Sequence, residues 1–364
     1  MKAAVLLQVG KPIEILDVEI DDPEQHEVLV RIKASGLCHS DLTIMNNDYG
    51  WPTPLVMGHE IAGIVERVGG SVTSVEVGDH VVGTLITSCG DCSNCRRGLP
   101  IRCTNPDASR RGPNSRPRLT LDGRPLTQLG DIGGFAEFTL LHERNVVKVS
   151  KEIPFDRACL LGCGVITGAG AVINTAKVKV GETVAVIGCG GVGLNTVQAA
   201  ALSGARRVIA IDIQPEKLEL AKKFGATDVV NSLEESDLPA KIQSIVGARG
   251  VDHAFEVIGL AATAQQAIDV CDVGGVAYMV GLQSPETRVS LGSRDLLRGQ
   301  KTLHGVHMGS TLSEVDIPMY ADFYLQGRLN LDDLVSQTIS LDDINEGYKV
   351  LAAGKVARSV VVFA

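Results

Sequence analysis

The chain has 364 residues, of which 45% are hydrophobic, 21% charged and 4% aromatic, a composition typical of a globular α/β protein with two domains. Its formal net charge of −9 excludes the basic field that attracts nucleic acid or anionic membranes, so we expect small-molecule partners, no nucleic acid and no membrane. The N-terminal apolar run is too short for a signal peptide, and no stretch reaches membrane-span length, so we expect a cytoplasmic protein. Nine cysteines in such a chain indicate metal binding or catalysis rather than disulfides.

Residues 1 to about 150 alternate short β-branched runs with Gly, Pro and Asp turns, a pattern typical of an all-β or barrel-like module. Within this part, 104–130 combines prolines and arginines with little apolar periodicity. We expect a long surface loop there, either simply solvated or serving as a lid or subunit contact. The strand candidates are 28–33, 61–68, 80–84, 135–140 and 146–149.

From about residue 180 apolar strand candidates alternate with helix candidates, which favours a parallel, doubly wound sheet. After residue 308 two helix candidates, 317–326 and 341–352, precede a last strand candidate, 359–363, and we expect this tail to return to the first domain. The middle strand candidates end at Ile187, Ile211, Val230, Val257, Val280 and Val306, and the helix candidates between them include 194–202, 215–224 and 261–270.

A glycine-rich loop, Gly188-Cys189-Gly190-Gly191-Val192-Gly193, joins a strand candidate to an alanine-rich helix candidate. Gly188 would permit the tight turn, Gly190 would let the backbone approach a pyrophosphate, and Gly193 would let helix and strand come close. The next strand candidate ends at Asp212, about twenty residues later, where an acid accepts hydrogen bonds from ribose hydroxyls and repels a 2′-phosphate. The order of strand, loop, helix and acid therefore predicts a dinucleotide site that prefers NAD to NADP.

Two other residues could belong to this site. Lys217 lies a little over one helical turn beyond Asp212, and it either supports the same ribose or is a solvated lysine on a helix face. Glu256, at the end of a later strand candidate, is open to the same two interpretations.

Four cysteines lie close together in the run Cys89-x-x-Cys92-x-x-Cys95-x7-Cys103, with Gly90 and Gly98 between them. A tetrahedral zinc ion takes four thiolates in a closed shell that leaves no position for substrate. The spacing therefore predicts a structural zinc site rather than four unrelated thiols.

Cys38, His59 and Cys163 form a second, dispersed set. Taken singly, each could be a core thiol or a satisfied interior histidine. Together they match the two cysteines and one histidine with which a catalytic zinc keeps its fourth position open. Their presence beside the four-cysteine run and the dinucleotide loop favours a catalytic zinc site.

With these motifs the chain resembles the zinc-containing alcohol dehydrogenases of the medium-chain dehydrogenase/reductase superfamily over essentially its whole length. The resemblance implies a GroES-like, mainly β catalytic domain made of 1–164 and 308–364, and a Rossmann NAD-binding domain at 165–307. It also implies two zinc ions per chain, one catalytic and one structural, with NAD as the cofactor. It rests on Gly58-His59-Glu60, Cys89, Cys92, Cys95, Cys103, Gly162-Cys163-Gly164, the loop from Gly188 to Gly193, Asp212 and Arg358.

The resemblance also implies roles for residues around the zinc ligands Cys38, His59 and Cys163. Glu60 resembles the acid that approaches the metal during ligand exchange, Asp41 the carboxylate that orients the histidine, and Ser40 the hydroxyl that passes the alcohol's proton onward. On the cofactor side, Thr167 resembles a residue near the nicotinamide, and Arg358 one that contacts the pyrophosphate.

The chain departs from the family pattern at two positions. His39 stands where many relatives have an arginine for the pyrophosphate, which predicts weaker and more pH-sensitive cofactor binding. Thr43 stands where some relatives have a histidine that ends the proton relay, so water or His39 would have to take that role.

The expected reaction is hydride transfer between a primary alcohol or aldehyde and NAD, with zinc as Lewis acid. The resemblance places Leu85, Tyr49, Leu282 and His307 on the substrate side, where Leu85 leaves room and Tyr49 offers an aromatic wall. We therefore expect medium-chain or aromatic alcohols as substrates. His307 is either a polar pocket residue or, as we favour, a packed histidine.

Three alternatives remain beside this interpretation. A thiol-adduct formaldehyde dehydrogenase resembles the same architecture, but those enzymes carry an acid where this chain has Tyr49. A zinc-ribbon protein that binds nucleic acid conflicts with the acidic charge and with the second metal set. A zinc-free homologue would lack the dispersed ligand set. The long stretch between Cys103 and Phe135 is more typical of dimeric relatives than of tetrameric ones, so we expect a homodimer.

Overall fold

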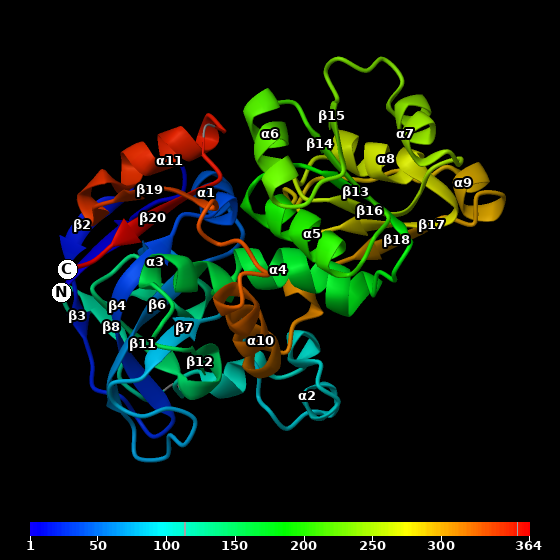
Figure 1. Cartoon of the computed structure of the whole chain (residues 1–364). Helices are drawn as coiled ribbons and strands as arrows, with labels where there is room; N and C mark the ends of the chain where they lie inside the picture. The colour runs from blue at the N-terminus through cyan, green and yellow to red at the C-terminus, as the bar shows by residue number, and fades with distance from the viewer. Residues whose placement is uncertain (113, 355) are drawn as a thin grey trace. The chain divides into compact units, whose positions relative to one another are not determined.

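The computed structural model describes residues 1–112, 114–354 and 356–364. These residues form two compact units, which Figure 1 shows in chain colours. Unit 1 consists of Met1–Gly164 with Thr311–Ala364, and unit 2 of Val165–Ser310. Residues 308–310, which the sequence interpretation placed in the first domain, therefore group with unit 2.

A seven-stranded sheet forms the centre of unit 1, in the order β12-β7-β6-β4-β20-β19, with β11 also paired to β4. The long strand β4 pairs with β6 along its length, while β11 covers its first half and β20 its last residues. The C-terminal tail therefore completes a sheet that the N-terminal part begins. The strands are β4 (Glu27–Gly36), β6 (Glu60–Val68), β7 (His80–Gly83), β11 (Phe138–His142), β12 (Val146–Lys148), β19 (Val335–Ile339) and β20 (Arg358–Val362).

Two smaller sheets complete the mainly β module expected from the sequence. One has the order β10-β5-β1-β2 and the other β3-β8-β9. The candidate strand 135–140 begins later than expected, because Phe135 pairs its backbone with Ala4 and Met57 instead of entering β11. The bounds are β1 (Lys2–Leu6), β2 (Glu14–Asp17), β3 (Glu19–Ile20), β5 (Leu55–Val56), β8 (Leu119–Leu121), β9 (Arg124–Pro125) and β10 (Thr127–Gln128).

The segment 104–130 is not the simple surface loop expected from its composition. It contains β8, β9 and β10, and Leu119 is buried. Two of its arginines reach the buried carboxylate of Glu27: Arg111 Nη2 lies 2.7 Å from Oε2, and Arg118 Nε lies 2.7 Å from Oε1. These ion pairs attach the segment to the start of β4.

The helices of unit 1 place parts of the site described below. Helix α1 carries the residues that follow Cys38, and α11 packs against α1. Helix 341–352 was expected as one element; it consists of a short 3₁₀ turn, Leu341–Asp343, followed by α11. The helices are α1 (His39–Asn46), α2 (Ser93–Arg96), α3 (Phe155–Ala158), α10 (Ser313–Leu325) and α11 (Ile344–Ala352), and α4 (Gly164–Gly170) begins at the boundary between the units.

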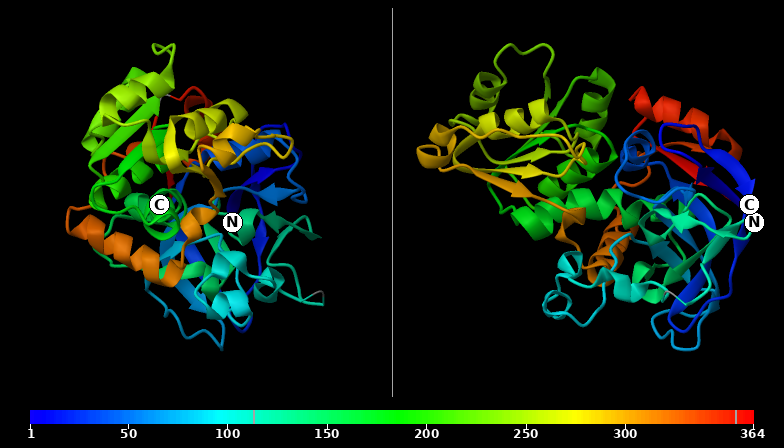
Figure 2. Two further views of the ribbon diagram at one scale, coloured as in Figure 1. Left: turned by 90° about the vertical axis from the view of Figure 1, so that its right-hand side faces the viewer. Right: turned by 180° about the vertical axis from the view of Figure 1, so that it is seen from behind.

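Unit 2 contains a six-stranded parallel sheet in the order β15-β14-β13-β16-β17-β18. Chain order reverses beside β13, as in doubly wound dinucleotide-binding sheets. Figure 2 shows helices on both sides of this sheet. The strands are β13 (Thr183–Ile187), β14 (Arg207–Asp212), β15 (Asp228–Asn231), β16 (Val251–Glu256), β17 (Cys271–Met279) and β18 (Thr302–Gly305), and the helices are α5 (Gly191–Leu202), α6 (Pro215–Lys223), α7 (Leu238–Val246), α8 (Ala261–Val270) and α9 (Ser293–Leu297).

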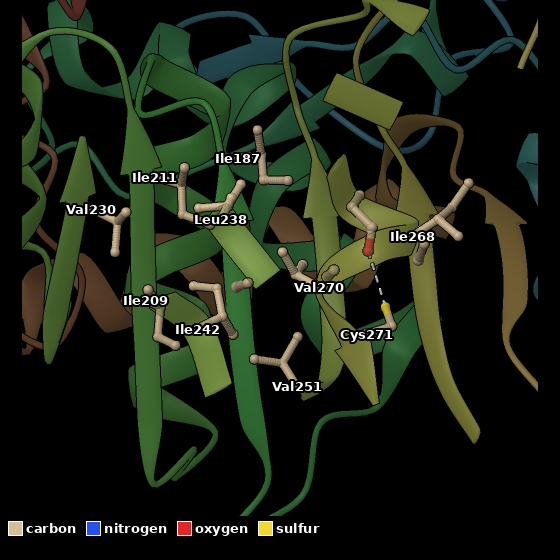
Figure 3. Packing of buried hydrophobic residues seen from close by; sticks show 14 of the residues in the cluster. Ile187, Ile209, Ile211, Val230, Leu238, Ile242, Val251, Ile268, Val270 and Cys271 are labelled. Carbon is tan, nitrogen blue, oxygen red and sulfur yellow. Dashed lines mark hydrogen bonds between the residues drawn. The ribbon is translucent and has the colours of Figure 1, made fainter. Parts of the chain in front are cut away.

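Helices α7 and α8 cover one face of this sheet, where Figure 3 shows the buried cluster. Leu238 and Ile242 of α7 and Ile268 of α8 pack there against strand residues such as Ile209 and Ile211. Local sequence explains the bounds of α7: the Asp237 side chain accepts from Ala240 N at 3.0 Å, and Gly247 ends the helix with φ +69°.

In the described part of the chain, no single helix has both the length and the apolar character needed to cross a membrane; one bent pair, Phe155–Gly162 with Gly164–Ala176, meets those two criteria when its helices are taken together.

Candidate active site

Four buried side chains of unit 1 meet at one point. Cys38, His59, Glu60 and Cys163 each offer one ligand atom, and these atoms all lie within 4.8 Å of one another. Cys38 precedes α1, Glu60 begins β6, and Cys163 precedes α4, so three separate elements bring them together. Two thiolates, one imidazole and a nearby carboxylate are a donor set that suits zinc with an open position.

Asp41 holds His59 in place from the side away from these ligand atoms. Its Oδ1 lies 2.8 Å from His59 Nδ1, and its Oδ2 accepts from Cys38 N at 3.2 Å. Because Nδ1 faces the carboxylate, Nε2 is left to face the ligand cluster. Burial lowers the pKa of His59, but the charge and hydrogen bond of Asp41 outweigh it and raise that pKa.

The Ser40 hydroxyl lies against the cluster. It donates to Cys38 Sγ at 3.1 Å and lies 3.3 Å from His59 Nε2. Ser40 is partly buried, whereas the preceding residue, His39, is exposed at the start of α1. The Thr43 hydroxyl donates to the backbone oxygen of His39 at 2.9 Å, within the same helix.

Glu60 and Arg358 form a buried ion pair beside the cluster, with 3.4 Å between Oε1 and Nη2. Neither carboxylate oxygen of Glu60 has a hydrogen-bond partner among the described residues, nor does Nη2 of Arg358. Burial raises the pKa of Glu60 to about 7, and the Arg358 guanidinium opposes this rise. Such orphaned polar atoms fit a site that takes a metal ion. Arg358 thus lies beside the metal set, and its expected contact with a pyrophosphate stays a prediction.

The contact between Cys38 and Cys163 shifts the pKa values of their two thiol groups in opposite directions. The contact with Cys163 lowers the pKa of Cys38, while the same contact, together with burial, raises the pKa of Cys163. Arg358 and His59 further lower the pKa of Cys38. One thiolate therefore forms readily in this buried place, and a divalent cation would favour the second.

The four-cysteine run also meets at one point. Four sulfurs about 2.3 Å from a tetrahedral centre lie about 3.8 Å apart. The observed Sγ–Sγ distances are 3.5 Å for Cys92–Cys95 and Cys89–Cys103, and 4.0 Å for Cys89–Cys95 and Cys92–Cys103. The cluster therefore has the dimensions of a closed zinc site.

Backbone amides prepare these sulfurs for metal binding. Cys92 N donates to Cys89 Sγ, and Cys89 N donates to Cys103 Sγ, both at 3.3 Å. Backbone hydrogen bonds from Thr104 and Cys95 lower the pKa of Cys92 to about 5. Thiolates are the form that coordinates zinc, so this loop favours the ligand state at Cys92, whereas burial raises the pKa of Cys95 to about 12.

The glycine loop of unit 2 has the geometry that the sequence motif predicts. Gly188 has φ +103°, which favours glycine. A Cβ at Gly193 would lie 1.8 Å from the Gly188 oxygen, so α5 approaches β13 more closely than a side chain would permit. A Cβ at Gly190 would meet no atom within 4 Å, and Gly190 directly precedes α5, which has no side-chain cap. The loop and helix start therefore fit a pyrophosphate group.

Asp212 ends β14 and ties this loop to its neighbours. Its Oδ2 accepts from Cys189 N at 2.7 Å, and its Oδ1 accepts from Ile213 N at 2.8 Å and Gln214 N at 3.0 Å. The carboxylate thus has a structural role that the motif alone did not indicate.

Glu256 is fully buried and has a local role. Its Oε1 accepts from Ile258 N, Gly259 N and the Thr263 hydroxyl at 2.7–2.9 Å, which organises the turn after β16. Thr167 is buried and contacts Met308, 3.6 Å from its sulfur. Lys217 lies on α6, partly exposed, which fits either of its two interpretations.

The four residues expected at the substrate are divided between the units. Leu85 and Tyr49 belong to unit 1, and both are partly buried. Leu282 and His307 belong to unit 2, where both are exposed. Burial nevertheless lowers the pKa of His307, and its interpretation as a packed histidine at the domain junction stays a prediction.

Both halves of the chain match family models. Residues 24–151 match the alcohol dehydrogenase GroES-like domain, and residues 191–324 match the zinc-binding dehydrogenase domain. Among curated relatives, S-(hydroxymethyl)glutathione dehydrogenase of Synechocystis is 38% identical, and that of Paracoccus denitrificans is 35% identical; the alignments cover 99% and 100% of this chain and 99% of each relative. Benzyl alcohol dehydrogenase from Acinetobacter calcoaceticus is a similar solved structure, with TM-score 0.93, 35% identity and coverage of 100% and 99%.

The fold and the two cysteine-rich sites define a zinc-dependent oxidoreductase that uses a nicotinamide cofactor. The chain belongs to the zinc-containing alcohol dehydrogenases of the medium-chain dehydrogenase/reductase superfamily. Its expected fold class is confirmed, and so are the expected cofactors, a catalytic and a structural zinc ion with NAD.

Proposed function

We propose that this protein transfers hydride between NAD and medium-chain or aromatic primary alcohols and their aldehydes. The observation that carries the substrate class is the character of the unit 1 side chains that the family resemblance places beside the zinc ligands. Leu85 is aliphatic and packs on the apolar cluster around Ile61 and Leu141, and Tyr49 is a partly buried aromatic. A small aliphatic side chain and an aromatic one favour an apolar substrate.

In this proposal Cys38, His59 and Cys163 hold the catalytic zinc, and the four-cysteine run holds the structural one. When bound, zinc supplies Lewis-acid polarisation of the substrate oxygen, and NAD accepts or gives the hydride. Asp41 keeps His59 oriented, and the Glu60 carboxylate would be an additional ligand for the zinc during ligand exchange.

The Ser40 hydroxyl, beside Cys38 Sγ and His59 Nε2, takes the alcohol's proton as the hydroxyl's own hydrogen is released outward. The preceding residue, His39, is exposed, and we propose that either His39 or water receives this proton. Thr43 does not replace the missing histidine here, since its hydroxyl donates to a backbone oxygen within α1.

On the cofactor side we propose that the loop Gly188, Gly190, Gly191, Val192 and Gly193 and the start of α5 bind the pyrophosphate, with His39 and Arg358 contributing charge. Asp212 accepts from the ribose, with Lys217 beside it, and Thr167 lies near the nicotinamide. The open space at the Gly190 Cα supports the first of these roles.

A similar structure, the benzyl alcohol dehydrogenase, supports an aromatic substrate. The curated relatives support a second candidate, since several are named S-(hydroxymethyl)glutathione dehydrogenase. S-(hydroxymethyl)glutathione carries carboxylates, so an enzyme that binds it needs cationic side chains for recognition. Three arginines of 104–130 are engaged with carboxylates of the chain: Arg110 with Asp131 and Asp107, and Arg111 and Arg118 with Glu27. This favours the alcohol.

One steady-state series tests the proposal. Each methylene buried in an apolar pocket contributes about 0.8 kcal/mol, which is roughly fourfold in kcat/KM per carbon from ethanol to hexanol. Benzyl alcohol should rank with hexanol, and the formaldehyde–glutathione adduct below both. Leu85→Phe should restore a preference for ethanol, while Leu7→Phe, at an exposed leucine, should not. A flat or falling series, or a dominant rate with the adduct, would reject the substrate class.

We further propose a homodimer and a cytoplasmic location. The dimer rests on family resemblance in the stretch between Cys103 and Phe135. Sedimentation equilibrium that returns monomer, or tetramer alone, would decide against it, and cell fractionation tests the location.

A further inference from the structure

Among the described residues of unit 1, two tyrosine hydroxyls are buried without a hydrogen-bond partner. Tyr348 lies in α11 and Tyr320 in α10, and both side chains are almost completely shielded from solvent. A hydroxyl buried without a partner loses its hydrogen bonds to water and gains none in return, so each instance needs a physical reason. The two tyrosines differ in what surrounds them.

Tyr348 packs behind the catalytic zinc ligands. Helix α11 lies against α1, which carries Asp41. The Tyr348 ring makes an edge-to-face contact with Phe135 at 6.2 Å between centroids, and both belong to an apolar cluster with Leu37. Leu37 precedes the ligand Cys38, so the ring packs against the chain that leads into the zinc site.

Phe135 links the same ring to the second ligand. A Cβ at Gly58 would lie 2.7 Å from the Phe135 ring, so the backbone directly before His59 lies on this aromatic residue. Burial raises the pKa of Tyr348 well above its ordinary range, and the charge of Asp41 is the next cause. Burial also raises the pKa of Tyr320, and the charge of Asp316 is the second cause. No zinc ligand contributes to that shift.

Asp41 has unused acceptor capacity. Its carboxylate is completely buried, and among the described residues Oδ1 bonds to His59 Nδ1 and Oδ2 accepts from Cys38 N. Each ionised carboxylate oxygen accepts two hydrogen bonds, so one lone pair remains on each. The Asp41 carboxylate has spare lone pairs, and a side-chain interaction with it contributes to the raised pKa of Tyr348. The Tyr348 hydroxyl meets no hydrogen-bond criterion with any described residue, so a full hydrogen bond to Asp41 would satisfy both groups.

We propose that Tyr348 is a positioning residue for the catalytic zinc: its hydroxyl donates to the Asp41 carboxylate when the metal is bound, and so restrains the group that orients His59. This inference rests on the proposed role of His59 as a zinc ligand. The chain of contacts runs from Tyr348 through Asp41 to His59 Nδ1, so the hydroxyl never touches substrate or metal. Its effect is on how firmly the imidazole is held.

Carboxylates that orient a metal-bound histidine typically affect metal affinity by 10- to 100-fold. Tyr348 acts one contact further away, so we expect a smaller effect, roughly three- to tenfold in the rate at which zinc leaves the catalytic site. The structural zinc should not respond, because its four cysteines come from a different loop.

The test compares Tyr348→Phe with Tyr320→Phe in the zinc-loaded enzyme. Both changes remove one buried, unpartnered hydroxyl from unit 1 and keep the ring, so they match in volume and in burial. Zinc release to an excess of the coloured chelator 4-(2-pyridylazo)resorcinol is followed with time. The phase of zinc release that is absent in His59→Ala belongs to the catalytic zinc. The thermal midpoint of unfolding of each variant is measured in parallel.

We expect Tyr348→Phe to accelerate the catalytic-zinc phase roughly three- to tenfold, with the structural-zinc phase unchanged and Tyr320→Phe like the unmodified enzyme in both phases. Equal catalytic phases in Tyr348→Phe and the unmodified enzyme would overturn the inference, and so would equal acceleration by the two tyrosine variants. If His59→Ala still holds two zinc ions, the proposed ligand set itself fails, which is a distinguishable result.

Discussion

Asp212 is expected to set the choice between NAD and NADP, because its negative charge would repel a 2′-phosphate. Two unit charges 5 Å apart at an effective dielectric constant of about 20 repel by roughly 3 kcal/mol. Salt and relaxation reduce this, so we expect at least about 1.4 kcal/mol between a ribose hydroxyl and a 2′-phosphate, a tenfold preference. Asp212→Gly should therefore narrow the ratio of kcat/KM for NAD over NADP by at least about tenfold.

The same carboxylate also accepts three backbone N–H groups, from Cys189, Ile213 and Gln214. Asp212→Gly frees all three, so the KM for both cofactors should rise in addition to the change in ratio. Asp212→Asn removes the charge but keeps one acceptor oxygen, so it should narrow the ratio with a smaller rise in KM.

The assay is the steady-state kcat/KM for each cofactor with one alcohol at saturation. Asp228→Asn serves as the control, because Asp228 begins β15 and pairs with Arg207 at the opposite end of the parallel sheet. A ratio unchanged within twofold in both Asp212 variants, with zinc content intact, would refute the reasoning.

Cys92→Ser should lose one of two zinc ions and lower the thermal midpoint, and elemental analysis that finds a single zinc in the unmodified enzyme would contradict this. Glu27→Gln should cost about 3 kcal/mol at pH 7, because the Arg118 guanidinium loses its carboxylate, while Arg111 keeps its pair with Asp21. Burial raises the pKa of Glu27, but the arginines outweigh it and depress that pKa, so this stabilisation is present above about pH 4.5 and disappears as pH falls further; urea midpoints that differ equally at pH 7 and pH 3.5 would contradict it. Gly193→Ala should raise the KM for NAD, since its Cβ would collide with the Gly188 oxygen, and an unchanged KM would argue against that contact.

The parts of the site that sequence predicts well are those whose chemistry is local. The spacing of the four cysteines predicted a compact sulfur cluster, and the glycine loop predicted the turn at Gly188 and the close approach at Gly193, because neighbouring residues alone determine these geometries. Family resemblance was needed to predict that Cys38, His59 and Cys163 form one site, because their spacing in the sequence does not indicate that they lie close together.

Contacts between distant residues account for what sequence did not provide. The segment 104–130 looked like a loop because its stabilising partner, Glu27, lies 84 residues before Arg111. The hydroxyl of Tyr348 gave no signal at all, since a tyrosine in an amphipathic helix normally reads as a packing residue. Only its burial beside α1 reveals a hydroxyl in need of an acceptor.

The pairing of β4 with β20 also has a consequence for synthesis. Unit 2 is continuous in the chain, whereas unit 1 joins both ends, as the bond from Ile13 N to Asn345 Oδ1, 332 residues later, illustrates. At roughly 5–20 residues per second, a ribosome needs on the order of tens of seconds between β4 and β20. During that interval the last residues of β4 form an open strand edge, the kind of surface that recruits other chains. A nascent chain therefore contains all the strands of the dinucleotide-binding sheet while the last residues of β4 still lack β20 as their partner.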